Sequence, residues 1–144
     1  GRIVRIVAGW ISRGCLAGLV LLALGCNEGL PIILESRQQG SPDSKWEFIS
    51  EHLDNGMGFG MGALYDEVHI HRPGEGAFKH GDQDASAVFY IESTYQDGDR
   101  PVVQWIDAHN LLIRYPDINK PGRAITQFQG VAIRYETYKL HPPK

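Results

Sequence analysis

The sequence predicts an all-β fold, a single small antiparallel domain of the sandwich or half-barrel type that follows an N-terminal signal or anchor helix. Short runs rich in β-branched and aromatic residues recur along the chain. Clusters of proline and glycine separate these runs, and no window sustains a helical period over a dozen residues. A length of 144 residues suits one such domain and is short for two.

Residues 1–26 are expected to form an export signal. A basic region ending at Arg13 precedes an uncharged apolar run from Gly14 to Gly25. Twelve helical residues rise about 18 Å, short of the roughly 30 Å hydrocarbon core, so the run suits a secretory signal better than a membrane span. The segment Ala23-Leu24-Gly25-Cys26 then resembles the lipobox of bacterial lipoproteins, although that pattern prefers Leu where Ala23 stands. The resemblance implies that Cys26 receives a diacylglyceryl group and becomes the mature N-terminus.

Two alternatives for this segment remain open. Residues 3–25 could form an uncleaved anchor or an ordinary signal, although Arg13 near the middle of a span would cost about 2.5–3.5 kcal/mol. They could instead form a buried core helix, which the lack of polar residues from Leu19 to Leu24 disfavours.

Charge and cysteine content limit what the rest of the chain can do. Beyond residue 26 there are 11 basic and 17 acidic side chains, a net charge of −6, so no nucleic-acid partner is expected. Cys15 and Cys26 are the only cysteines, which leaves the mature domain without a disulfide, a cysteine nucleophile or cysteine-ligated zinc. No cofactor is expected. The expected partners are the membrane, reached through the lipid anchor, and another protein of the envelope.

Residues 27–40 are expected to be a tether and residues 41–144 the β domain. Within the tether, the apolar patch from Leu30 to Leu34 could dock on the domain or form a first edge strand. Alternating or β-prone sequence predicts strands over 45–50, 67–71, 87–91, 102–106, 111–115 and 131–138, with residues 107–110 as a hairpin turn. Alternation places the following side chains in the core: Trp46, Phe48, Phe89, Ile91, Trp105, Leu112 and Tyr135.

Two resemblances concern the whole domain. The opening from Ser41 to Trp46 resembles the Ser-Pro-Asp-Gly-Lys start of TolB-type propeller blades, but a propeller needs at least four blades of about 40 residues. Residues 41–144 are too few to close one. The same opening, with Trp105, the strand Leu111–Tyr115 and the late Ile133–Tyr135, is similar to a family of small bacterial lipoproteins and exported domains of unknown function. That resemblance implies a fold and a location but no reaction.

The chain departs from this family after its first strand. Many members carry Cys-Gly-Ala-Thr-Thr there, whereas this chain has alternating glycines from Gly56 to Gly62. We expect a surface loop in this stretch rather than a strand, because glycine weakens strands. Its Met57, Phe59 and Met61 could contact a partner.

The sharpest local pattern is His69-x-His71-x3-Glu75, followed by His80. It is similar to the first metal-binding motif of cupins, and two residues apart on a strand share a face, so both histidines could reach one ion. The second cupin motif is absent, and Gly62 leaves six residues before His69 where the cupin pattern has five. The alternative is that both histidines lie on a solvated strand face opposite Val68 and Ile70.

The leading functional interpretation is therefore a lipid-anchored β domain of the bacterial cell envelope, acting as a binding or assembly accessory rather than as an enzyme. No Gly-x-Ser-x-Gly nucleophile motif, phosphate-binding loop or EF-hand spacing occurs in the sequence. The rival interpretation is a cupin-like metal-dependent enzyme that uses His69, His71 and Glu75, with His80 or His109 as a further ligand.

Overall fold

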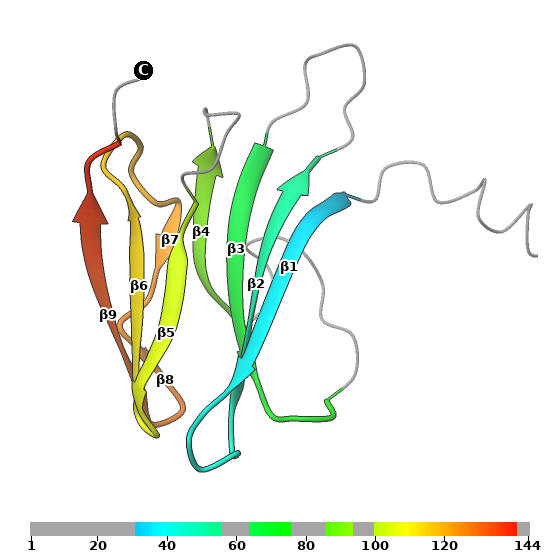
Figure 1. The fold of residues 1–144 in the computed structure, drawn as a ribbon, viewed down its shortest axis with the longest axis vertical. Coiled ribbons are helices and arrows are strands. Elements are labelled where there is room, and N and C mark those ends of the chain that lie inside the picture. The colour runs from blue at the N-terminus through cyan, green and yellow to red at the C-terminus, as the bar shows by residue number, and fades with distance from the viewer. Residues whose placement is uncertain (1–30, 56–63, 76–85, 94–99, 141–144) are drawn as a thin grey trace, which may run out of the picture. The chain divides into compact units, whose positions relative to one another are not determined.

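Nine strands in two sheets make up the part of the chain that the computed structural model describes, residues 31–55, 64–75, 86–93 and 100–140 (Figure 1). The strands are β1 (Ile32–Gly40), β2 (Glu47–Asp54), β3 (Leu64–His71), β4 (Ala87–Ser93), β5 (Val102–Asp107), β6 (Asn110–Pro116), β7 (Arg123–Ala124), β8 (Gln127–Phe128) and β9 (Val131–Tyr138). These residues contain no helix, and so none that could span a bilayer. The all-β prediction is confirmed, whereas the expected signal segment with Cys26 lies outside the described residues.

The first sheet has the strand order β1-β2-β3-β4-β7 and is antiparallel throughout. The first four strands follow one another as a meander. The turn between β1 and β2 contains the Ser-Pro-Asp opening, in which the Asp43 carboxylate accepts hydrogen bonds from the Ser41 hydroxyl and the Lys45 backbone N–H. These contacts explain the motif, because the short Asp43 side chain accepts a hydrogen bond from a backbone N–H that has no strand partner within the turn.

The second sheet has the order β5-β6-β9-β8 and is mixed. The β5–β6 hairpin turns at Asp107 and Asn110 as predicted, with Asp107 accepting hydrogen bonds from the His109 backbone and the Asn110 amide. The β6–β9 pair is parallel, which differs from the purely antiparallel expectation. The chain leaves β6, visits the first sheet as β7, and returns through β8, so β9 comes back beside β6 in the same direction. Between β8 and β9, Gln129 and Gly130 both have positive φ, as a two-residue hairpin requires.

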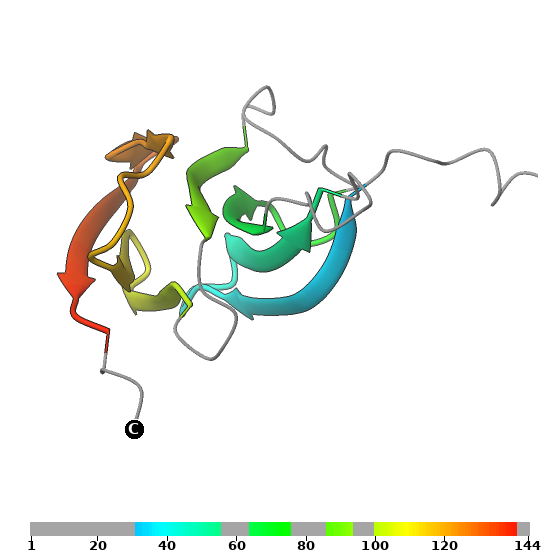
Figure 2. The same cartoon turned by 90° about the horizontal axis from the view of Figure 1, so that it is seen from above.

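The core lies between the two sheets, which face one another in Figures 1 and 2. Residues from both sheets form one buried cluster, with side chains such as Val68, Ile70 and Phe89 fully buried. The predicted core positions Phe48, Phe89 and Ile91 belong to this cluster, and Trp46, Trp105 and Tyr135 pack against it.

Two sequence-based expectations need correction. Leu112 is buried but lies outside the core cluster, and its neighbours Leu111 and Ile113 occupy the core instead. All three side chains are apolar and buried, so alternation alone could not set the register of β6. The stretch expected as a tether is a strand over Ile32–Gly40, paired with β2 along its length, so the edge-strand alternative for its apolar patch is the one that the structure shows. Its polar composition reflects an edge position, where one side of the strand faces water.

The two lateral sides of the sandwich are held in different ways. On one side the chain itself passes between the sheets through Ile125 and Thr126, and both backbones are hydrogen-bonded: Ile125 N–H to Val88 O, and Ile133 N–H to Thr126 O. On the other side the edge strands β1 and β5 each have a single paired neighbour. Side chains bridge β1 to Arg100 and β5 there, and this side of the domain carries the candidate site.

Candidate functional site

The predicted metal ligands are not brought together among the described residues. His69 and His71 share one face of β3, as the spacing predicts, but their rings have different partners. Nε2 of His69 lies 3.0 Å from Glu67 Oε2 and its Nδ1 lies 3.0 Å from Ser86 Oγ. His71 directs Nδ1 to the carbonyl oxygen of Arg72 at 2.8 Å. The expectation that both histidines lie on a solvated face is wrong for His69, which is fully buried.

Glu75 stabilises a turn in this structure. Its Oε2 accepts the backbone N–H of Arg72 at 3.1 Å, three residues earlier. Within the described ranges no group of three or more His, Cys, Asp or Glu side chains could hold a metal ion. His80 and the lipidation candidate Cys26 lie outside those ranges, as does the glycine-rich segment from Gly56 to Gly62.

The burial of His69 reveals a polar cluster that the sequence analysis missed. Glu51 on β2 lies directly opposite Glu67 on β3, and both carboxylates are buried on the face of the first sheet that points away from the core. Such a cluster is compatible with folding because its members hydrogen-bond one another, as His69 does with Glu67 and Ser86. The sign in the sequence was that one face of β3 is polar and carries Glu67, His69 and His71, whereas Val68 and Ile70 lie on the opposite face.

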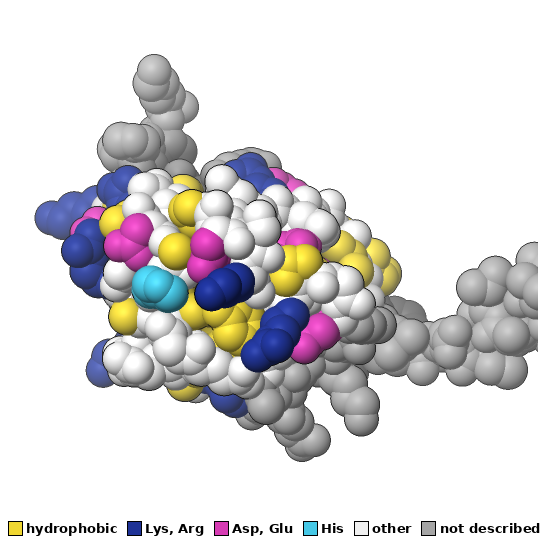
Figure 3. All heavy atoms as spheres, turned by 90° about the horizontal axis from the view of Figure 1, so that it is seen from below, with side chains coloured by type: hydrophobic (Ala, Val, Ile, Leu, Met, Phe, Trp, Pro, Cys, Tyr) yellow, Lys and Arg dark blue, Asp and Glu magenta, His cyan; other side chains and the backbone are white. Residues whose placement is uncertain are grey.

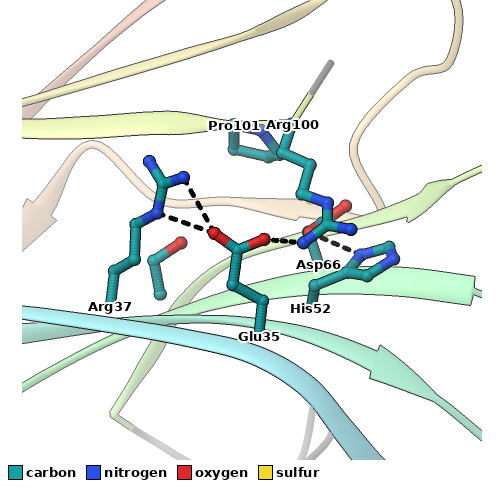
Figure 4. A pocket seen from close by; sticks show the side chains of 7 residues that line it. Glu35, Arg37, His52, Asp66, Arg100 and Pro101 are labelled. Atoms are coloured by element: carbon teal, nitrogen blue, oxygen red, sulfur yellow. Dashed lines mark hydrogen bonds and ion pairs between the residues drawn. The ribbon is translucent and has the colours of Figure 1, made fainter. Parts of the chain in front are cut away.

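A different set of polar residues lines the side between β1 and β5. Here a cavity of about 20 Å³, enough for one water molecule, is enclosed by Glu35, Arg37, Ser50, His52, Asp66, Arg100 and Pro101. Figure 4 shows Glu35 extending from β1 between two arginines. Its carboxylate forms ion pairs with Arg37, at 2.8 Å, and with Arg100. Arg100 stands just before β5, so this ion pair links β5 to β1.

Behind that ion-pair group lies the buried pair of His52 and Asp66. His52 Nδ1 is 2.9 Å from Asp66 Oδ1, and both side chains are nearly inaccessible. Asp66 Oδ2 is also buried and accepts no hydrogen bond. Burial raises the pKa of the Asp66 carboxyl above its ordinary value, an effect that the adjacent His52 partly opposes.

Next to this cavity a larger groove follows the gap between the two edge strands. It has a volume of about 260 Å³ and is lined by Arg37, Gln38, Gln39, Phe48, Ser50, Pro101, Val102 and Val103. Three of these residues, Arg37, Ser50 and Pro101, also line the small cavity, so the two spaces adjoin. Phe48 and the valines supply an apolar floor. Arg37 and the two glutamines supply polar groups along the β1 side.

Two direct contacts link the β1 side of the groove to the β5 side. The indole N–H of Trp105 donates to the carbonyl oxygen of Gln39 at 3.0 Å, and the Trp105 ring packs near Phe48 with ring centroids 6.3 Å apart. The Glu35–Arg100 ion pair lies four residues earlier on β1 and five earlier on the β5 side. These two contacts bracket the groove, and neither is a strand–strand backbone hydrogen bond.

A second hollow lies at the lower end of the domain. Its lining is Ser44, Lys45, Trp46, Arg72 and Pro73, and its volume is about 460 Å³. The Arg72 guanidinium lies over the Trp46 ring, 5.5 Å from the centroid. Figure 3 shows this end, where basic side chains lie on either side of hydrophobic ones and acidic side chains are close by. The mixture of charges gives no strong field of one sign.

Comparisons with known proteins add no information about the function of this site. Neither a family model, nor a curated protein, nor a solved structure matches the chain.

Proposed function

We propose that this chain is a lipid-anchored binding domain of the bacterial cell envelope that holds an extended segment of another envelope protein in the groove between β1 and β5. The observation that carries the proposal is the groove itself, an apolar floor between two edge strands that side chains alone join. The location rests on the lipobox-like sequence that ends at Cys26.

An extended polypeptide suits this groove for two reasons. Edge strands present backbone N–H and C=O groups that have no strand partner on one side, and an added segment can bond to them. The volume of about 260 Å³ is also below the roughly 300–1,000 Å³ of pockets that enclose small molecules, which favours insertion of a few side chains from a longer chain.

The metal-dependent alternative receives no support from the described residues. His69, His71 and Glu75 each hydrogen-bond a different partner and do not converge on one point. The binding domain is therefore the function that the geometry favours.

Site-specific photo-cross-linking in intact cells tests the groove. A photoreactive residue at Val102, which lines the groove, is expected to cross-link an extended segment of another envelope protein, identified by mass spectrometry of the linked peptide. Ile118 is the matched control because both side chains are 43% exposed and Ile118 lies outside the groove. Equal cross-linking at the two positions, or linkage of Val102 only to lipid or to a second copy of this chain, would contradict the proposal.

A second pair of variants tests whether the groove must be open. Gln38→Trp places a large side chain in the groove and is expected to abolish the Val102 cross-link. Gln104→Trp adds the same bulk to an exposed position on β5 outside the groove lining and should leave the cross-link intact. Loss of the cross-link in both variants would indicate a general disturbance of β5 rather than occupation of the groove.

A further inference from the structure

The start of β1 is an exposed apolar patch, formed by Ile32, Ile33 and Leu34. Their exposed fractions are 56%, 51% and 51%, higher than those of the other exposed large hydrophobic side chains in the described residues. Those others, Val102, Ile106 and Ile118, are separated along the chain. Single exposed hydrophobic residues are common on protein surfaces, but three in succession require an explanation.

The local geometry explains how three consecutive side chains stay exposed. Successive residues of a regular strand point to opposite faces, so a covered sheet face would normally bury one or two of three. Here the pairing of β1 with β2 is irregular between Ile33 and Glu35, and β1 is the edge of its sheet. On the inner strand, Leu53, the partner of Ile33, is completely buried. The domain thus covers β2 at this point and leaves β1 open.

The patch lies close in sequence to Cys26, the proposed site of lipid attachment. Only residues 27–31 separate Cys26 from Ile32, and six extended residues reach at most about 20 Å. The lipids on Cys26, in the proposed function, hold that residue at the membrane, and the headgroup layer outside the hydrocarbon core is roughly 5–8 Å thick. The patch is therefore confined to the neighbourhood of the bilayer surface, whatever path the connecting residues take.

The charges next to the patch are compatible with an anionic membrane. Arg37 on the same strand has a side chain that is 69% exposed, and Glu35 is shared between Arg37 and Arg100. The three groups together carry one net positive charge, and Asp54, whose Cα pairs with that of Ile32, offsets it. The surface beside the patch is therefore close to neutral, so burial of apolar side chains rather than attraction between charges would hold it at the membrane.

We infer that Ile32, Ile33 and Leu34 insert into the membrane interface beside the lipid anchor and dock the domain against the bilayer. The inference rests on the lipid anchor of the proposed function. Docking would give a defined orientation to a domain that a short segment tethers, with the start of β1 at the membrane.

A local probe is needed to test docking, because the lipids alone would keep the protein in the membrane fraction. The full chain is produced with Cys15→Ser and Ile33→Cys, purified with its lipids, labelled at position 33 with an environment-sensitive fluorophore, and reconstituted in vesicles of phosphatidylethanolamine and phosphatidylglycerol. The control carries Ile106→Cys. Ile106 is 47% exposed and lies at a similar irregularity near the end of the edge strand β5. In Figure 1 the end of β5 is far from the start of β1.

Docking predicts a blue-shifted emission at position 33 and strong quenching when the vesicles contain lipids with a doxyl group in the acyl chain. Position 106 should show neither effect. Emission at position 33 that matches position 106 would overturn the inference. A blue shift at position 33 without quenching by doxyl lipid would also overturn it, because a second copy or another protein would then cover the patch.

The mass of the same purified protein shows whether Cys26 carries lipid, and so distinguishes a failure of docking from a failure of lipid attachment. A mass that includes the acyl groups on Cys26, together with an unquenched probe, would reject docking and leave the lipid anchor in place. A chain without the acyl groups would reject the anchor itself, and docking with it.

Discussion

The indole nitrogen of Trp105 lies 3.0 Å from the carbonyl oxygen of Gln39, and this hydrogen bond joins the edge strands of two different sheets. The opposite side of the sandwich is held by backbone hydrogen bonds around Ile125. A side that depends on side chains can open without breaking a β ladder. This difference is why we assign binding to the β1–β5 side.

Replacing Trp105 should weaken that link measurably. Trp105→Phe keeps an aromatic ring near Phe48 but removes the hydrogen bond to Gln39, and is expected to lower the free energy of unfolding by about 0.5–1.5 kcal/mol. Urea unfolding measures the loss. Trp46→Phe is the control, since Trp46 is also partly buried and packs on Phe128, and its indole donates no hydrogen bond among the described residues. This substitution also weakens the contact with the Arg72 guanidinium, so any loss that it shows is an upper limit for the effect of ring size. Equal losses in both variants would show that ring size, not the hydrogen bond, matters.

The buried Asp66 should make stability depend on pH in a defined direction. Its pKa is raised by burial from 3.8, so the folded state keeps a proton that the unfolded chain has already lost. Stability should therefore fall as the pH rises from about 3.8 through the raised pKa, and the loss should be complete above it. Asp66→Asn, which cannot ionise, is expected to lack this fall in a series of thermal melts at different pH values.

Asp43 offers a control of opposite sign for that experiment. Hydrogen bonds from the Ser41 hydroxyl and the Lys45 backbone lower the pKa of this exposed carboxyl. The contribution of Asp43 to stability is therefore present above the ordinary pKa of an aspartate and is lost as the pH falls through the lowered pKa. Asp43→Asn should therefore leave the Asp66-dependent fall unchanged. If Asp66→Asn and wild type have the same pH profile, the cost of burying the Asp66 carboxylate has been overstated.

Tyr135 should stabilise the sandwich through its hydroxyl. The group donates to the carbonyl oxygen of Ile125 at 2.6 Å and lies 3.2 Å from that of Val88 in the other sheet. Tyr135→Phe keeps the ring on Phe89 but leaves these acceptors with one partner fewer, so a loss of about 1–3 kcal/mol is expected. Denaturant unfolding provides the measurement, and an unchanged midpoint would show that water replaces the hydroxyl.

His69 should act as a structural residue. It is fully buried and bridges Glu67 and Ser86, so His69→Ala removes two hydrogen bonds and leaves a cavity. We expect a clear drop in melting temperature. His71→Ala, at a partly exposed position on the same face, should cost less. Stoichiometric metal in the untagged wild-type protein, lost together in both variants, would instead revive the cupin-like interpretation.

The proposed lipid anchor can be tested by replacing each cysteine in turn. Cys26→Ala should abolish labelling by a radioactive or clickable fatty acid and leave a precursor that keeps residues 1–25. Cys15→Ala should change neither labelling nor processing. The measurement is fatty-acid labelling read together with the mass of the mature N-terminus. An unlabelled wild-type protein that retains Gly1 would favour the uncleaved anchor.

Local sequence was sufficient to predict most of the strands, because each is a short β-prone run between turn residues. The segments 45–50, 67–71 and 87–91 correspond to β2, β3 and β4, although the ends differ by several residues. The turn at Asp107 was also predictable, since its carboxylate bonds to backbone groups only two residues away. Hydrogen bonds between residues two or three positions apart depend only on the local sequence, which is why such turns can be predicted from it.

Tertiary structure decided everything that depends on distant partners. From the sequence, only the apolar start of β1 was recognisable as a possible edge strand. Its polar remainder was not, because the stability of that part comes from the ladder with β2. His69 looked like a solvated residue or a metal ligand, and only the packing of β3 between its neighbours shows that it is buried against Glu67 and Ser86. The groove arises because the chain crosses between the sheets at Ile125 and leaves β1 and β5 to meet through Trp105 and Gln39, residues that lie 66 positions apart in the sequence. Residue pattern sets which segments become strands, but the pairing of edges that are remote in sequence is determined by the packing of the whole core.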